Sequence, residues 1–225
     1  MLSPTAPVLP AAVLFDMDGT LVDTEHLWWQ AVAETALGLG HRLTDADLSE
    51  VLGRPVAHTA RHLHRVTGGA VPEARIVPDL DASFTARVAE QVLPRPGALH
   101  LLARLRDAQV PAALVTASPR HVVDVVLRTL GAHWFALTVA AEDTARTKPD
   151  PEPYLRAAAL LDVRPRDCVV VEDSPVGLAA ALAAGCRAIA VPSTVPIPAE
   201  PGVVVVGSLE DVDLVLLSAL AAERT

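Results

Sequence analysis

Short runs of apolar residues alternate along this chain with longer segments in which apolar positions recur every three or four residues. Five of the short runs are nearly free of polar residues, at 11–15, 111–116, 168–173, 186–191 and 203–207. Strands that are buried on both faces have this composition. The longer segments are amphipathic or rich in alanine, and they predict helices at 98–108, 120–131, 153–162 and 175–185. Strands that alternate with helices predict an α/β fold, a doubly wound parallel sheet.

The stretch after the first predicted strand interrupts this alternation. It contains WWQAVAETALGLG, DADLSEVLG and VAHTARHLHRV, followed by one long further segment, and all of them predict helices. The proline-rich LPRPG at 93–97 then leads back to the alternating pattern. We therefore expect an α/β core formed by 1–22 and 94–225, and a helical cap formed by 23–93 that lies over the carboxyl edge of the sheet.

Composition and charge narrow the range of partners. The 225 residues are 51% hydrophobic, and 18 Lys and Arg stand against 27 Asp and Glu, a formal net charge of −9. Binding to nucleic acid or to an anionic membrane is therefore not expected, and the partner is expected to be a small molecule. The apolar runs are shorter than the ~18 to 20 residues of a membrane helix, and the N-terminal stretch lacks the basic segment of a signal peptide. We expect a cytoplasmic protein, a monomer or a weak homo-oligomer.

The two cysteines, Cys168 and Cys186, lie in apolar surroundings and have no spacing typical of a metal site. Buried free thiols are favoured over a disulfide.

Polar side chains follow three of the predicted strands at the point where each strand ends. They are Asp16 and Asp18, Thr116 and Ser118, and Glu172 and Asp173. The carboxyl ends of parallel strands meet at one edge of a sheet, so we expect these side chains to cluster there. Carboxylates this close either rise in pKa or bind a cation, and hard oxygen ligands favour Mg²⁺, which often takes a substrate phosphate as well. Lys148, in ARTKPDPEPY, would supply a further positive charge.

These motifs resemble those of the haloacid dehalogenase-like hydrolase superfamily, in the branch with a helical cap inserted after the first strand. DMDGT at 16–20 is similar to the first motif, Thr116 in LVTAS to the second, and Lys148 in TKPDPEPY to the third. VVVEDSPVGLAAALAAG, which contains Glu172 and Asp173, is similar to the fourth. All four occur in the family's order over 13–191.

The resemblance implies a role for each catalytic residue. Asp16 would attack the phosphorus atom and form an aspartyl-phosphate. Asp18 would act first as general acid toward the leaving oxygen and then as general base toward water. Thr116 would hydrogen-bond a phosphoryl oxygen, and Lys148 would neutralise charge on the nucleophile and the phosphoryl group.

The resemblance also implies the ligands of a magnesium ion. Asp16, the backbone carbonyl of Asp18 and Asp173 would hold it, and Glu172 would bind it directly or through water.

Predicted substrate contacts come from the second and third motifs and from a loop between two cap helices. They are Thr116, Ala117, Ser118, Lys148, Gly53 and Arg54. In relatives that loop often faces the active site, so Arg54 is a candidate to bind a substrate hydroxyl or phosphate, with a surface arginine as the alternative.

Three reactions fit the resemblance unequally. Dehalogenases lack a second aspartate two residues after the nucleophile, so Asp18 argues against that chemistry. Mutases of the β-phosphoglucomutase type carry a cap histidine where Trp28 stands here, and an arginine a few residues after the loop glycine, whereas Arg54 follows Gly53 directly. DTEHLW at 23–28 resembles the opening of sugar-phosphate phosphatases. We favour a phosphatase that acts on a small phosphate ester; the alternatives are a sugar phosphomutase and a binding module without turnover.

Three histidines in the predicted cap, His58, His62 and His64, raise the question of a second metal. The sequence places no matching carboxylate or cysteine beside them, and Arg61 and Arg65 lie between them. A solvated or packing face of the cap is therefore favoured over a metal site.

Overall fold

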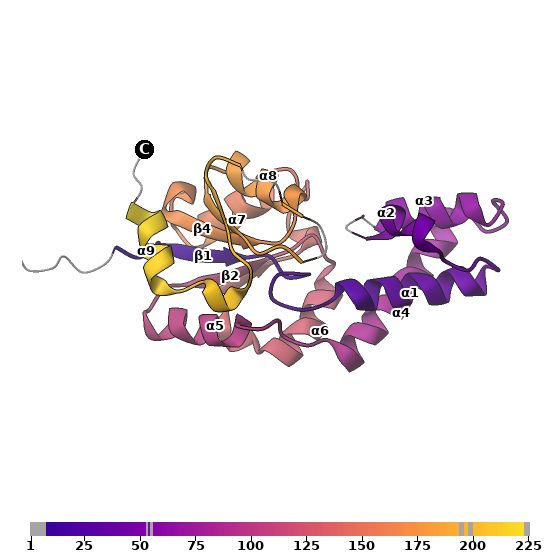
Figure 1. Ribbon diagram of the computed structural model, residues 1–225, viewed down its shortest axis with the longest axis horizontal. Helices are drawn as coiled ribbons and strands as arrows, with labels where there is room; N and C mark the ends of the chain where they lie inside the picture. The colour runs from indigo at the N-terminus through magenta and orange to yellow at the C-terminus, as the bar shows by residue number, and fades with distance from the viewer. Residues whose placement is uncertain (1–7, 53, 55, 194–195, 198–199, 223–225) are drawn as a thin grey trace, which may run out of the picture.

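The structure, a computed structural model, describes residues 8–52, 54, 56–193, 196–197 and 200–222. Its centre is a six-stranded parallel sheet in the order β3-β2-β1-β4-β5-β6 (Figure 1). The strands are β1 (Ala12–Phe15), β2 (Ala112–Val115), β3 (Leu137–Val139), β4 (Cys168–Glu172), β5 (Arg187–Ala190) and β6 (Val203–Val205). The predicted doubly wound parallel sheet is confirmed.

Helices cover both faces of this sheet. They are α5 (Ala98–Asp107), α6 (Arg120–Leu130), α7 (Glu152–Leu160), α8 (Pro175–Ala183) and α9 (Leu214–Ala222). Successive strand residues point to opposite faces, so Val13 and Phe15 pack with α5, α6 and α9, whereas Leu14 packs with α7 and α8. The sheet is therefore buried on both sides, which explains why its strands are almost wholly apolar.

Two elements were not predicted from the sequence. The strand β3 has three residues, two of them only partly buried, and so lacks the apolar run of the other strands. The helix α9 is apolar except for Ser218, and its hydrophobic positions show almost no helical periodicity.

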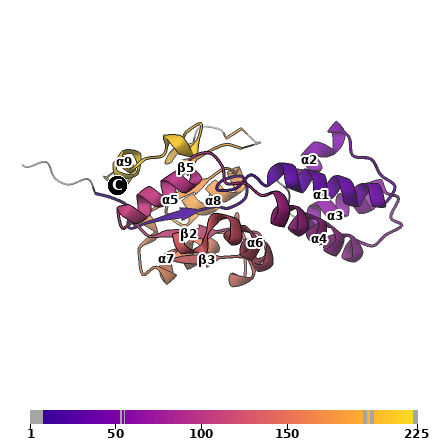
Figure 2. The ribbon, with the colours of Figure 1, turned by 90° about the horizontal axis from the view of Figure 1, so that it is seen from below.

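In the described part of the chain, four α-helices between β1 and α5 form the second lobe, which lies at one end of the molecule (Figure 2). They are α1 (Glu25–Gly38), α2 (Leu48–Val51), α3 (Val56–Val66) and α4 (Glu73–Gln91). The lobe has an apolar cluster of its own around Trp28, whose Nε1 donates to the Val51 carbonyl at 2.9 Å and whose ring meets Phe84 edge-to-face. This separate cluster supports the proposed division into a core, 1–22 and 94–225, and a cap, 23–93.

The two lobes are joined by paired connections. The chain leaving the core and the chain returning to it form an antiparallel bridge at Val22 and Pro94. At a second point, Nε2 of His121 on α6 lies 3.0 Å from the carboxylate of Asp81 on α4. The cap is thus held against the core both at its connections and through α4.

Both cysteines are buried free thiols, as expected. Within the described part of the chain, each helix is too short or too polar to span a lipid bilayer.

A shorter buried side chain in the central strand should destabilise the core. Leu14→Ala removes a fully buried side chain from β1 and leaves a cavity, so we expect the free energy of unfolding to fall by about 2–5 kcal/mol. Urea unfolding measures the change. Leu160→Ala on α7, where the leucine is half exposed, is the control and should change stability by at most about 0.5 kcal/mol. Equal losses in both variants would contradict this account of the core.

Candidate active site

The strand order brings the predicted motif residues to one edge of the sheet. β1 lies between β2 and β4, so Asp16 after β1, Thr116 after β2 and Glu172 at the end of β4 become neighbours. The backbone N–H of Asp16 donates to the carbonyl of Val171 at 3.0 Å, which extends the pairing of β1 with β4 by one residue. All three side chains are buried.

Lys148 is the cation of this cluster. Its Nζ donates to Asp16 Oδ1 and to Glu172 Oε1, each at 2.6 Å, and to the Val115 carbonyl at 2.9 Å. The ammonium group also lies 5.0 Å from the centre of the Tyr154 ring. Burial alone would lower the pKa of Lys148, but the two carboxylates outweigh it and raise that pKa above its usual value. The lysine therefore stays charged.

Both carboxylate oxygens of Glu172 accept hydrogen bonds. Oε1 accepts from Lys148 and from the Tyr154 hydroxyl at 2.7 Å. Oε2 accepts from the backbone N–H groups of Asp173 and Ser174 and from the Ser174 hydroxyl, at 3.0–3.3 Å. This fully buried carboxylate is fixed in place and positions Lys148.

Asp18 lies among hydroxyl groups and makes no contact with Lys148. Its Oδ1 accepts from Thr24 at 2.9 Å, and its Oδ2 accepts from Thr116 at 3.2 Å and from Ser118 at 2.6 Å. Ala117, between the last two, is exposed. The two aspartates of the first motif thus have different environments, an ammonium for one and hydroxyls for the other.

Asp173 faces the turn that follows β1. Thr20 donates to its Oδ1 at 3.5 Å, and the Ser193 hydroxyl makes a short contact with its Oδ2. Gly19 has a φ of +79°, and a Cβ there would overlap Oδ2 of Asp173, so the turn requires glycine. Burial and the charge of Glu172 raise the pKa of Asp173 to about 7, although the Ser193 hydroxyl opposes the rise.

Three carboxylates fit a divalent cation. Asp16, Glu172 and Asp173 each place one oxygen within 4.8 Å of the others. Burial raises the pKa of Asp16 well above its usual value; Lys148 lowers it, and the neighbouring carboxylates raise it again. A second cation would relieve this repulsion, and three hard oxygen donors suit Mg²⁺. Glu172 is already hydrogen-bonded on both oxygens, so Asp16 and Asp173 are better placed to bind the ion directly.

Sequence reasoning missed three residues that hold the carboxylates, namely Tyr154, Thr20 and Ser193. The only tyrosine of the chain lies in an alanine-rich helix, where a buried hydroxyl needs a partner, and this was the available signal. Thr20 and Ser193 gave none, because their contact with Asp173 joins positions more than 150 and about 20 residues apart in the chain.

Of the two cap residues predicted to contact the substrate, Gly53 and Arg54, the structure describes only Arg54. Arg54 is exposed between α2 and α3, and its Nε donates to the Ser49 carbonyl at 3.1 Å. Gly53 lies outside the described residues. The structure therefore does not bring Arg54 into contact with the motif residues, and its role in substrate binding stays a prediction.

Two of the three cap histidines do have carboxylate partners, contrary to the sequence-based expectation. His58 lies 2.9 Å from Glu50 and His62 lies 2.7 Å from Asp47, while His64 contacts a backbone carbonyl. Glu50 lies on α2, 8 residues before His58, and Asp47 lies in the short 3-10 helix before α2, 15 residues before His62, so neither was visible in the local pattern. In the described chain these ligand atoms do not converge as those of the carboxylate cluster do. Each of these histidines thus has a hydrogen-bond partner inside the cap, and their assignment to a solvated or packing face stays a prediction.

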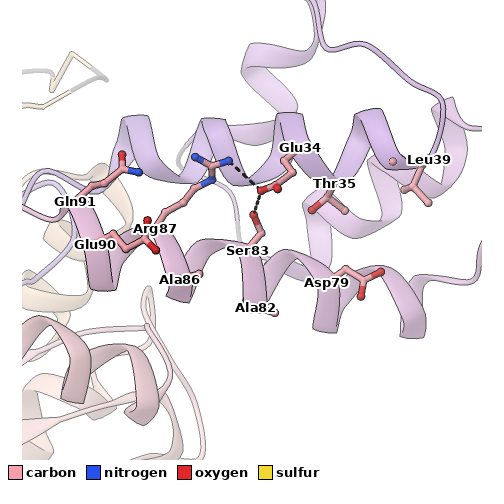
Figure 3. Close-up of a pocket in the computed structure, with 11 residues that line it drawn as sticks. Glu34, Thr35, Leu39, Asp79, Ala82, Ser83, Ala86, Arg87, Glu90 and Gln91 are labelled. Atoms are coloured by element: carbon pink, nitrogen blue, oxygen red, sulfur yellow. Dashed lines mark hydrogen bonds and ion pairs between the residues drawn. The ribbon is translucent and has the colours of Figure 1, made fainter.

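A groove of about 580 Å³ lies between α1 and α4 (Figure 3). Glu34 accepts there from Ser83 at 2.6 Å and from Arg87 at 2.9 Å. None of the motif residues line this groove, so it is separate from the candidate site.

The fold and the buried cluster define a hydrolase of the haloacid dehalogenase type. The model of the haloacid dehalogenase-like hydrolase family matches residues 10–185, and the chain belongs to this family. The resemblance inferred from the four motifs is thereby confirmed.

Individual relatives agree with this assignment. The chain is 34% identical over 190 residues to validoxylamine A 7'-phosphate phosphatase of Streptomyces hygroscopicus subsp. limoneus, covering 80% of this chain and 85% of that protein. It is 34% identical over 215 residues to hexitol phosphatase A of Escherichia coli (strain K12), covering 91% and 89%. The crystal structure of CbbY from Rhodobacter sphaeroides in complex with phosphate superposes with a TM-score of 0.79 at 30% identity, covering 90% of this chain and 96% of that one.

The pKa of Asp173 predicts a pH dependence for the effect of added magnesium on stability. A folded-state pKa of about 7 lies above the usual value near 4, so this group's contribution to metal-free stability is complete at low pH and lost as the pH rises through about 7. A divalent cation binds a carboxylate in its deprotonated form, so magnesium held by Asp173 would stabilise the protein increasingly over the same range. We expect Mg²⁺, relative to EDTA, to raise Tm more at about pH 8 than at about pH 6. An equal rise at both values would contradict the linkage.

A methyl group at Gly177 should disturb the cluster. The added Cβ would overlap the Glu172 carboxylate, which would have to leave Lys148 and Tyr154. We expect Gly177→Ala to cost about 1–3 kcal/mol in urea unfolding and to weaken Mg²⁺ binding measured by calorimetry. The matched control is Gly38→Ala at the end of α1, where a Cβ meets nothing within 4 Å, and it should cause neither loss. Unchanged magnesium affinity in Gly177→Ala would count against the role of Glu172.

Proposed function

We propose that this chain, a phosphoric monoester hydrolase, is a magnesium-dependent phosphatase that acts on a small phosphorylated metabolite of the sugar-phosphate type. One observation carries the proposal. Asp16 is held by the Lys148 ammonium at 2.6 Å, while Asp18 is held separately by the hydroxyls of Thr116 and Ser118. A site that only bound phosphate would not need a second aspartate prepared for proton transfer.

The residues divide the reaction into two steps. Asp16 attacks the phosphorus atom with the oxygen that Lys148 does not hold, and the ester oxygen leaves with a proton from Asp18. Asp18, now ionised, takes a proton from water, which attacks the phosphorus atom and releases phosphate and Asp16. Thr116 and Lys148 bind the phosphoryl oxygens in both steps.

A magnesium ion would be held by Asp16, Asp173 and the backbone carbonyl of Asp18, with Glu172 as an outer contact. When bound, it supplies neutralisation of phosphoryl charge, which phosphoryl transfer chiefly requires. Lys148, held by two carboxylates, keeps its charge at the same point throughout.

The relatives support a hydroxyl-rich substrate. Two of them are named as phosphatases of validoxylamine A 7'-phosphate and of hexitol phosphates, and a hexitol is a sugar alcohol. A helical cap beside the sheet edge suits a small ester, because closure over the leaving group excludes water.

Phosphate release from a panel of small esters tests the proposal. The panel contains hexitol phosphates, glycerol phosphate, 2-phosphoglycolate, a nucleoside monophosphate and both anomers of glucose 1-phosphate. We expect release that requires Mg²⁺, stops in EDTA and falls by at least about 10³-fold in Asp16→Asn, because that variant loses the nucleophile.

Two further variants separate the alternatives. Asp18→Asn should lose turnover and keep magnesium-dependent ligand binding, while Asp124→Asn, an exposed residue on α6, is the matched control and should keep full activity. Formation of glucose 6-phosphate without net phosphate release would indicate a phosphomutase. Binding of esters without turnover of any would indicate a binding module.

A further inference from the structure

The strand β5 brings a further polar side chain to the candidate site. β4 and β5 pair in register up to Glu172 and Ala190, and the backbone N–H of Val191 then donates to the carbonyl of Glu172 at 2.7 Å. Two residues later, the hydroxyl of Ser193 donates to Oδ2 of Asp173. Ser193 lies outside the four motifs, so it reaches the cluster from a strand end that the motifs do not include.

The two oxygens of the Asp173 carboxylate have different surroundings. Oδ2 accepts from Ser193 and faces Gly19, where an added Cβ would overlap Oδ2 and lie 3.0 Å from the Ser193 oxygen. Oδ2 is therefore enclosed between a hydroxyl and the backbone of the turn after β1. Oδ1 accepts from Thr20 at 3.5 Å, which is the outer limit for a hydrogen bond, so Oδ1 is the less firmly held oxygen.

The other two carboxylates of the cluster are also held by donors. Oδ1 of Asp16 accepts from Lys148 at 2.6 Å, and both oxygens of Glu172 accept at 2.6–3.3 Å. Each of the three carboxylates thus has at least one oxygen that a donor already holds. Partners of this kind orient a metal ligand, because they fix which oxygen it presents to the ion.

A carboxylate that is held on one oxygen favours a cation that takes one oxygen from each ligand. Mg²⁺ requires near-octahedral geometry and usually binds a few carboxylates together with waters and phosphate. Ca²⁺ is larger, takes about six to eight oxygens and often binds both oxygens of one carboxylate. For Ca²⁺ to bind Asp173 in that way, Oδ2 would have to leave Ser193.

We propose that Ser193 is a positioning residue that holds Oδ2 of Asp173 and so makes the cluster select Mg²⁺ over Ca²⁺. The inference rests on the magnesium ion of the proposed function and names the residue that discriminates between two cations of equal charge. Charge alone does not separate these cations, whereas the number of carboxylate oxygens open to the ion does. The hydroxyl acts through Asp173 and needs no contact with the ester.

Calorimetry on the whole metal-free chain tests the selection, with Mg²⁺ and Ca²⁺ titrated separately and no ester present. Ser193→Ala releases Oδ2, so Mg²⁺ should bind more weakly, while Ca²⁺ should bind at least as well as to the unmodified chain. We expect the ratio of the Ca²⁺ Kd to the Mg²⁺ Kd to fall by about 10-fold or more, the usual effect of losing a group that orients a metal ligand. Ser193→Thr keeps the hydroxyl, so its ratio should be nearly unchanged.

The matched control is Ser208→Ala. Ser208 lies as far along the chain after β6 as Ser193 does after β5, and it is also half-buried. Its hydroxyl accepts from the backbone N–H of Glu210 at 3.1 Å, and its removal should leave both affinities unchanged. A ratio that is unchanged in Ser193→Ala, or that falls equally in Ser193→Thr, would overturn the inference, because the hydroxyl would then not select the cation.

An assay separates this inference from the proposed function. With Mg²⁺ fixed, Ca²⁺ should inhibit the hydrolysis of p-nitrophenyl phosphate by Ser193→Ala at about 10-fold lower concentration than for the unmodified chain. If the protein hydrolyses no ester, the phosphatase function fails, and the calorimetric ratio still decides the role of Ser193. If the unmodified chain hydrolyses esters but binds Ca²⁺ as tightly as Mg²⁺, the function stands and the inference is overturned.

Discussion

The ion pairs of one buried lysine hold the candidate site together. Carboxylates at the ends of two adjacent strands, Asp16 and Glu172, meet at a point shielded from water, where two negative charges are unfavourable. The ammonium group of Lys148 lies 2.6 Å from each of them. Breaking a buried pair of this kind by removing one partner leaves an uncompensated charge. The loop that carries Lys148 is therefore bound to the sheet edge by charge as well as by packing.

This arrangement depends on the order of the strands. Because β1 lies between β2 and β4, the residues that follow β1 have hydroxyl groups from β2 on one side and carboxylates from β4 on the other. Asp16 takes part in the charged cluster, while Asp18, two residues further on, is held by hydroxyls. One short segment thus presents two carboxylates in different environments, a difference that hydrolysis in two steps requires and simple anion binding does not.

The cap begins beside Asp18, the acid/base of the proposed mechanism. Thr24, the residue before α1, donates to Asp18, and the bridge between Val22 and Pro94 pairs the two connections of the cap. A change in the position of the cap would therefore alter the hydrogen bond that Asp18 accepts from Thr24.

The amino-acid sequence by itself determined the parallel α/β core, the inserted helices and the family, because buried strands, helices and the four motifs are local patterns. It also indicated which strand ends carry polar groups. Only the tertiary structure shows which side chains contact each other. Examples are Tyr154 with Glu172, Ser193 with Asp173, and His62 with Asp47. The three-residue strand β3 likewise exists through its pairing with β2. These contacts join residues 15 to 25 positions apart that only packing brings together, so no local pattern records them.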